Sequence, residues 1–224
     1  MSTYAIGDIH GCFDALITLI SFIQPGEDDT VVFLGDYIDR GPDSNGVIEW
    51  IHEESKRGNF ICLRGNHELM MLESRHNPAM LDAWLACGGR ASLESYGWTG
   101  GRNWPELIPD HHWQFIERTR PHHENEATIF VHAMLHPNLP LHEHDEFQLY
   151  WEKCHELHPH ESGKRVIVGH TRQTSGIPRE FAGGVCIDTA CVSGQWLTAL
   201  NAETGEYFQA NQAGENRRDR LGNR

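Results

Sequence analysis

Short apolar runs alternate with stretches of helical periodicity in the first third of the chain. Three runs rich in β-branched residues have the length and flanking glycines of buried strands. They lie at residues 3–6, 30–34 and 59–63. Each is followed by a polar loop and then by apolar residues spaced three and four apart, which predicts a helix. These helices are expected at 13–23, 45–56 and 68–75. Strands alternating with helices predict an α/β fold with a parallel sheet.

The pattern changes between residues 76 and 127, where helical and irregular stretches alternate with prolines. We interpret this segment as a helical insertion, with a helix over 79–87 that Gly88 and Gly89 end. Closely spaced short strands then predict a second sheet. They are expected at 128–131, 165–168, 185–188, 197–200 and 206–209.

The chain of 224 residues fits one domain, which we place over residues 1–210. Residues 211–224 are rich in Asn, Gly and Arg and have little to bury, so we expect a disordered tail. No apolar run approaches the roughly 18 residues that span a bilayer, which argues against a membrane protein. The chain enters a strand pattern without a basic leader, which favours a cytoplasmic protein.

Charge and cysteine content exclude two further classes. The formal net charge of −14 argues against general nucleic-acid binding, which requires clustered Lys and Arg. The six cysteines include no CxxC pair, so we expect free thiols and no thiolate-bound structural zinc. With so few basic residues, any phosphate-containing ligand would have to be bound by a small local group of side chains.

Polar loops follow each of the first three strands, at residues 7–11, 35–41 and 64–68. Ligands bind beyond the carboxyl ends of parallel strands, so these loops should meet in one crevice. Asp8 and His10 are two residues apart on an extended loop and can bind one ion together. Asp36 has two carboxylate oxygens and could bridge two ions about 3.5 to 4 Å apart. Each loop alone has a structural explanation, because Gly-Asp is a common turn dipeptide, but the three together favour a metal site.

The three loops read G-D-x-H-G, G-D-x-x-D-R-G and G-N-H-E. In these motifs the chain resembles the calcineurin-like metallophosphoesterases, most closely the PPP-type serine/threonine protein phosphatases of bacteria and phages. The resemblance covers about residues 3 to 210. It implies an α/β fold built as a two-sheet αββα sandwich with a helical cap. It also implies two divalent metal ions, with manganese expected first and iron or zinc as alternatives. The implied ligands are Asp8, His10, Asp36, Asn66, His132 and His170.

The resemblance also implies catalytic roles. His67 would be the general acid that protonates the leaving group, and Asp39 would orient it. Arg40 and Arg64 would bind the non-bridging phosphate oxygens, with Asn66 close to the substrate. A hydroxide bridging the two metals would attack phosphorus directly, without a phosphoenzyme.

Two positions depart from the family's pattern. Met134 stands where Gly usually follows His-Ala, and we expect it to affect substrate choice. Ala190 stands where Gly commonly follows Asp-Thr. The peripheral histidines are interpreted as solvated polar residues with no assigned ligand role, and adventitious metal binding is the alternative. They lie at positions 111, 112, 122, 123, 142, 144, 155, 158 and 160. Trp84, Trp98 and Trp104 are interpreted as packing anchors of the insertion, one of which could line a substrate groove.

The leading functional hypothesis is a phosphatase acting on phosphoserine, phosphothreonine and also phosphotyrosine in a phosphoprotein or phosphopeptide. The alternative enzyme is a dinucleoside polyphosphate hydrolase of the diadenosine tetraphosphate type. Related symmetrical tetraphosphatases lack an acidic residue at the position of Asp39, so Asp39 favours the monoesterase. A third hypothesis is a non-catalytic binding module, against which the complete ligand set speaks. We expect no nucleic-acid or membrane partner, and the sequence leaves the oligomeric state open.

Overall fold

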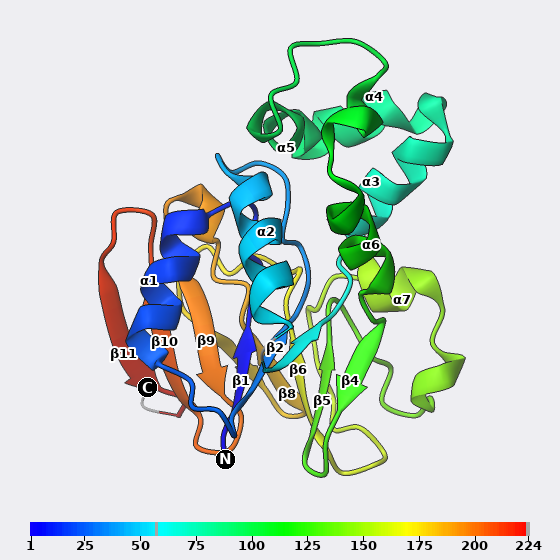
Figure 1. Ribbon diagram of the computed structural model, residues 1–224. Helices are drawn as coiled ribbons and strands as arrows, with labels where there is room; N and C mark the ends of the chain where they lie inside the picture. Colours follow the sequence, from blue (N-terminus) through cyan, green and yellow to red (C-terminus); the bar gives the residue numbers. More distant parts are fainter. Residues whose placement is uncertain (57, 223–224) are drawn as a thin grey trace.

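Two mixed β-sheets packed face to face form the centre of the protein in the computed structural model, which describes residues 1–56 and 58–222 (Figure 1). The first sheet has the strand order β11-β10-β9-β1-β2-β3 and the second β4-β5-β6-β8-β7. The strands are β1 Thr3–Ile6, β2 Thr30–Phe33, β3 Asn59–Cys62, β4 His122–Glu124, β5 Thr128–Val131, β6 Arg165–Val168, β7 Arg179–Phe181, β8 Gly184–Cys186, β9 Leu197–Asn201, β10 Glu206–Ala210 and β11 Asn216–Arg220. Strands β1, β2 and β3 pair in parallel, as do β5, β6 and β8.

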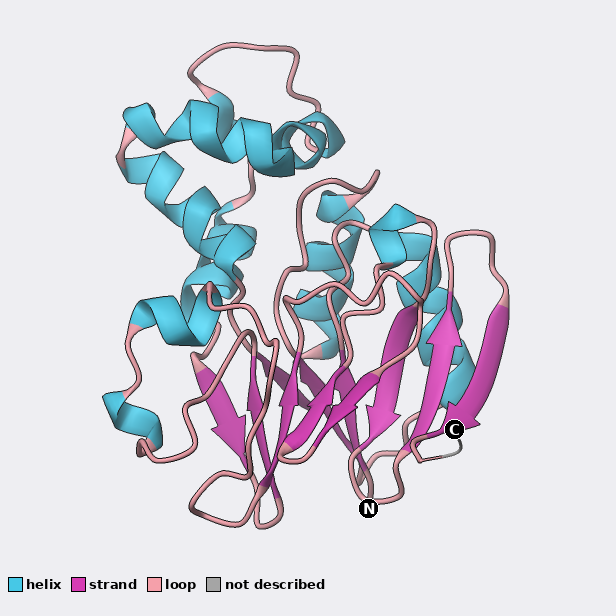
Figure 2. Cartoon of the chain, turned by 180° about the vertical axis from the view of Figure 1, so that it is seen from behind, coloured by secondary structure: helices cyan, strands magenta, loops and turns pink. Residues whose placement is uncertain are grey.

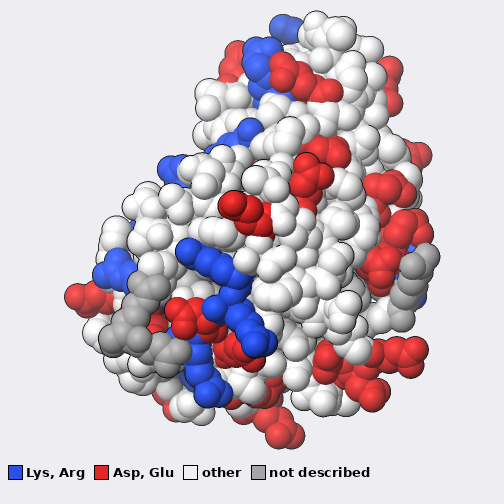
Figure 3. Space-filling view, turned by 90° about the vertical axis from the view of Figure 1, so that its left-hand side faces the viewer, with Lys and Arg blue, Asp and Glu red and all other residues white. Residues whose placement is uncertain are grey.

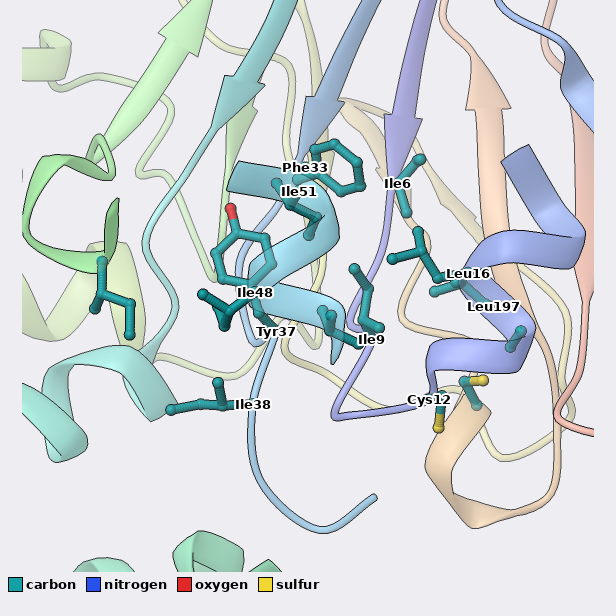
Figure 4. Packing of buried hydrophobic residues seen from close by; sticks show 14 of the residues in the cluster. Ile6, Ile9, Cys12, Leu16, Phe33, Tyr37, Ile38, Ile48, Ile51 and Leu197 are labelled. Atoms are coloured by element: carbon teal, nitrogen blue, oxygen red, sulfur yellow. The ribbon is translucent and has the colours of Figure 1, made fainter. Parts of the chain in front are cut away.

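The two-residue period of the strands sorts their side chains between two cores. Val32 and Leu34 face the second sheet, where they share one buried cluster with Phe130 of β5. Val31 and Phe33 face the other way and pack with the helices. Figure 4 shows this outer cluster, where Phe33 lies against apolar side chains of the neighbouring elements. Each such side chain contributes about 1.5–3 kcal/mol by leaving water.

Helices cover the outer face of each sheet, which gives the αββα layers that the resemblance implied. The helices are α1 Phe13–Ile23, α2 Ser44–Glu54, α3 Asn66–His76, α4 Leu81–Trp84, α5 Arg90–Ser95, α6 Asp110–Arg118 and α7 Glu146–Tyr150. Helices α1 and α2 pack on the first sheet and α7 on the second. Helices α3 to α6 stand at one end of the strands, as the view from behind shows (Figure 2). No helix among the described residues is long and apolar enough to span a membrane.

The insertion differs in detail from its prediction. The helix expected at 79–87 is divided into a 3-10 turn at Pro78–Met80, α4, and a wider turn at Leu85–Gly89. Gly88 has φ of 121°, but the helical segment does not end there, because α5 follows directly at Arg90. Its carbonyl accepts a hydrogen bond from the backbone of Arg40 at 3.1 Å, which ties the insertion to the second motif loop. The expected boundary at residue 127 is too late, because β4 already belongs to the second sheet.

The expectation of a disordered tail over 211–224 is wrong for β11, which pairs antiparallel with β10 at the sheet edge. All five β11 side chains are exposed, so no apolar pattern announces the strand. Arg217 makes several specific contacts: it donates to Gln209 Oε1 and to the carbonyl of Gly176, and its guanidinium lies 4.2 Å from the Trp196 ring centroid. Basic side chains gather among acidic ones on this side of the molecule (Figure 3). Charged side chains are a common protection of an edge strand. Residues 223–224 lie outside the described residues.

Candidate functional site

The predicted ligands meet at the carboxyl ends of parallel strands from both sheets. Each of them follows a strand closely in sequence. Asp8 and His10 follow β1, Asp36 follows β2, Asn66 begins α3 after β3, His132 follows β5 and His170 follows β6. Five of the seven non-glycine residues with positive φ among those described lie in these loops: His10, Asp36, Asp39, Arg40 and His170. Such backbone strain, of order 1–3 kcal/mol each, is characteristic of functional sites.

Asp36 lies at the centre of the cluster and faces both sides of it. Its Oδ2 lies 3.5 Å from His10 Nε2, and its Oδ1 lies 3.4 Å from His132 Nε2. Asn66 Oδ1 lies 3.1 Å from the same His132 nitrogen. Asp36 belongs to two groups of potential ligand atoms, one with His10 and His67 and one with His132 and His170. A carboxylate shared by two such groups has the arrangement of a bridging ligand between two cations.

The histidines are held in orientations that suit ligation. His10 Nδ1 lies 2.8 Å from the carbonyl of Ile38, and His132 Nδ1 lies 2.9 Å from that of Leu34. Each Nδ1–H donates to its carbonyl, so each Nε2 keeps a lone pair for a metal. Burial lowers the pKa of His10 and His132 well below 6.5, and that of His170 to about 4. All three are therefore neutral at pH 7, as ligation requires.

The buried carboxylates fit a metal pair electrostatically. Asp8, Asp36 and Asp188 are at most 4% exposed. Burial raises the pKa of each, and the charge of Asp188 raises that of Asp8 further. Several carboxylates in so dry a space repel one another, and divalent cations offset that cost. With imidazole nitrogens beside carboxylate and amide oxygens, the donor set suits Mn, Fe or Zn.

His67 and Asp39 form a hydrogen-bonded pair beside the cluster. His67 Nδ1 lies 2.6 Å from Asp39 Oδ2. The same oxygen accepts from Trp84 Nε1 at 2.8 Å, and Ser92 Oγ donates to the other oxygen at 2.6 Å. Burial raises the pKa of Asp39 to about 7, while the hydrogen bonds from Ser92 and Trp84 oppose the rise. The insertion thus holds the carboxylate that orients His67.

Glu68 joins the second and third motif loops. Its buried carboxylate accepts backbone hydrogen bonds from Asp36, Tyr37 and Gly65, each at 2.9 Å. Gly65 itself leaves no room for a side chain, because a Cβ there would overlap Asp36 Oδ1. The sequence motif contains Glu68, but the three backbone contacts that explain it become visible only in the folded chain.

A cleft of ≈ 230 Å³ opens onto the cluster. The predicted residues Asp36, Arg40, Asn66, His67 and His170 line it, together with four that sequence reasoning missed: Trp151, Lys153, Arg172 and Asp188. Arg172 stands two positions after His170, a spacing that could have drawn attention to it. Nothing in the local pattern marks Trp151 or Lys153.

Arg64 is predicted to bind substrate, but among the predicted substrate-binding residues it is the one that does not line the cleft. Its guanidinium donates to Thr119 Oγ1 and to the carbonyls of Ile116, Glu117 and Thr119 at the end of α6. Arg40, in contrast, lines the cleft, and its guanidinium contacts His10 Nε2. Arg64 therefore fixes the insertion, whereas Arg40 lies at the cleft beside the predicted ligand His10.

Other sequence interpretations fare differently. Met134 packs with the outer core of the second sheet and does not line the cleft. Ala190 has φ of 61°, which explains why glycine suits that position. Trp84 and Trp104 are buried packing anchors, with ring centroids 5.1 Å apart.

The interpretation of the peripheral histidines as solvated is wrong for those that are buried: His112, His144 and His160. All six cysteines are free.

Comparisons with known proteins give a consistent family but divided functions. Residues 1–183 match the family model described as calcineurin-like phosphoesterase. A symmetrical bis(5'-nucleosyl)-tetraphosphatase of Methylobacillus flagellatus is 32% identical over 139 residues, which are 61% of this chain and 44% of the relative. The serine/threonine-protein phosphatase 1 of Salmonella typhimurium is 38% identical over 87 residues, 38% of each chain. The chain thus spans less than half of the length of both relatives.

A solved chain proposed to be a diadenosine tetraphosphatase has a TM-score of 0.68 at 19% identity, covering 100% of this chain and 95% of the other. At this identity the likeness concerns the fold alone. It agrees with the two-sheet architecture described above.

Proposed function

Since this chain belongs to the calcineurin-like phosphoesterase family, we propose that it is a phosphoesterase that hydrolyses phosphate monoesters with two divalent cations. The observation that carries the proposal is Asp36, whose two oxygens face imidazoles on opposite sides. The cations would be held by Asp8, His10, Asp36, Asn66, His132 and His170. When bound, they supply Lewis-acid chemistry, lowering the pKa of water and withdrawing charge from the phosphoryl group.

The chain's own residues supply the remaining chemistry. His67 holds a proton for the leaving oxygen, and Asp39 keeps its ring in place through Nδ1. Arg40 bonds to phosphate oxygens from the side of the cleft and offsets their charge. Arg64 has no such role in this proposal, because its Nε and Nη2 donate to Thr119 Oγ1 and to carbonyls at the end of α6.

A phosphoprotein or phosphopeptide is the substrate class we propose first. The Asp39–His67 pair serves a serine, threonine or tyrosine oxygen, which needs a proton as it leaves. The proposal includes manganese as the first metal, with iron or zinc as alternatives. It also includes a cytoplasmic location, with which the six free thiols agree.

A dinucleoside polyphosphate is the second candidate, and one observation favours it. Lys153 and Arg172 line the cleft beside Arg40, so three cationic side chains are available to one ligand. A tetraphosphate chain carries more negative charge than a single phosphomonoester and could use all three.

Competitive turnover separates the two candidates. The metal-loaded protein is assayed with phosphoserine and phosphotyrosine peptides and with diadenosine tetraphosphate at equal concentrations, and the metal-stripped protein serves as control. We expect metal-dependent release of phosphate from the peptides, with kcat/KM at least about tenfold above that for the dinucleotide. A reversed ratio would establish the second candidate, and no metal-dependent turnover of either would refute the proposed activity.

A further inference from the structure

A second group of metal-ligating side chains lies outside the candidate metal centre, between α2 and α6. Glu49 of α2 faces two consecutive histidines of α6. Glu49 Oε2 lies 2.9 Å from His111 Nε2 and 2.7 Å from His112 Nε2. The three ligand atoms lie within 4.8 Å of one another. Two imidazoles that direct the same nitrogen toward one carboxylate oxygen form an N,N,O donor set.

His112 is held in place for ligation by a further contact. Its ring is fully buried, and its Nδ1 lies 2.8 Å from the hydroxyl of Tyr96. A hydroxyl can donate or accept, so it suits either tautomer of the ring. With Nε2 bound to a cation, Nδ1–H donates to Tyr96, which is the outer contact that metal-bound histidines generally make. Burial also lowers the pKa of His112, which keeps the imidazole neutral.

The open side of the cluster leaves room for an ion and its water. The side chains of Glu49 and His111 are 50% and 45% exposed. His52, three residues after Glu49 on α2, places its ring centroid 5.1 Å from that of His111. In tetrahedral geometry with metal–ligand distances of 2.0–2.1 Å, ligand atoms lie roughly 3.3 Å apart. The two distances from Glu49 Oε2 to the imidazole nitrogens, 2.9 and 2.7 Å, therefore need to widen by only about half an ångström.

We propose that Glu49, His111 and His112 bind a zinc ion that links α2 to α6. Two imidazoles and one carboxylate form a set that zinc uses, with water in the fourth position. The partial positive charge of the first turn of α6 opposes a cation, and the carboxylate of Glu49 offsets it. Helix α2 follows the loop of Asp36, and α6 belongs to the insertion. The ion would therefore link the insertion to the helix that follows one of the metal-binding loops.

The test separates this site from the dinuclear centre by combining two substitutions. Zinc content is measured after equilibration and gel filtration for the wild type, His111→Ala, Asp36→Asn and the double variant. His142→Ala is the matched control, because His142 is also exposed and lies 3.8 Å from a single glutamate, Glu143. We expect His111→Ala to lose one equivalent of zinc in both backgrounds, and His142→Ala to lose none. Equal zinc content with and without His111 in both backgrounds would overturn the proposal.

Thermal unfolding provides a second measurement that does not depend on activity. Zinc at a hundredfold excess over its dissociation constant should raise the Tm of the Asp36→Asn variant by roughly 5 to 10 °C. The additional substitution Glu49→Gln should abolish this shift, since the amide retains the shape but loses the charge. A zinc-induced shift that survives both Glu49→Gln and His111→Ala would show that Glu49, His111 and His112 form only a hydrogen-bonded surface cluster.

Discussion

The indole of Trp84 is the contact through which the insertion acts on the candidate acid, and replacing it by phenylalanine tests that link. Trp84 Nε1 donates to Asp39 Oδ2 at 2.8 Å, and the same oxygen holds His67 Nδ1 at 2.6 Å. Hydrogen bonds to charged groups contribute about 1.5–3 kcal/mol. The bond also opposes the rise in the pKa of Asp39, so its loss leaves less of the ionised partner that His67 needs.

If this loss is transmitted to the transition state, kcat/KM should fall roughly 10- to 100-fold, at about 1.4 kcal/mol per factor of ten. The fall should depend on the leaving group. Phenolate needs the proton that His67 holds, whereas 4-nitrophenolate leaves without help. We therefore expect Trp84→Phe to impair phenyl phosphate turnover by that factor and 4-nitrophenyl phosphate turnover by less than about threefold.

Trp104→Phe is the matched control for Trp84→Phe. Trp104 packs against Trp84 with centroids 5.1 Å apart, so its substitution disturbs the same packing and spares the bond to Asp39. Its effect should be the same for both substrates. The reasoning would be refuted if Trp84→Phe reduced kcat/KM equally for the two substrates. It would also be refuted if the effect of Trp104→Phe depended on the leaving group.

Three further predictions follow from other contacts. Glu68→Gln should lower the free energy of unfolding by ~2–5 kcal/mol, because an NH2 replaces one carboxylate oxygen and leaves at least one buried backbone N–H without its acceptor. Calorimetry should show a Tm lower by roughly 5–15 °C, and an unchanged Tm would contradict this reasoning. Arg64→Ala should lower the free energy of unfolding by ~1–3 kcal/mol and leave KM nearly unchanged. Arg40→Ala should instead reduce kcat/KM. The opposite pattern in steady-state kinetics would show that Arg64 binds the substrate. Arg217→Ala should speed hydrogen exchange in Asn216–Arg220 without altering turnover, and unchanged exchange would show that the Arg217 side chain does not hold β11 in place.

The central strands were predictable because their side chains obey a simple rule. Val31 to Leu34 are apolar without interruption, as expected of a strand covered on both faces. The clustering of the candidate ligands is predictable for a related reason: polar residues placed after such strands must meet at one edge of the sheets. His132 and His170 were assigned by resemblance alone, since their approach to Asp36 depends on the packing of two sheets.

The features that the sequence did not predict depend on tertiary contacts and leave little local pattern. Strand β11 has no buried side chain and depends on β10, so only the tertiary structure specifies it. Arg64 lies in a motif loop, but the carbonyls at the end of α6 compete for its guanidinium. Lys153 enters the cleft from a segment that no local pattern marks, and only the spacing from His170 indicates Arg172. Periodicity therefore specifies elements, whereas the direction of a long side chain depends on which acceptors the fold brings near.

The direct test of the central claim is the anomalous scattering of crystals of the manganese-loaded protein. We expect two anomalous peaks, about 3.5 to 4 Å apart, one on each side of the Asp36 carboxylate. The peak on one side should be bonded to His10 and that on the other to His132. A single peak, or two peaks that do not share Asp36, would contradict the account.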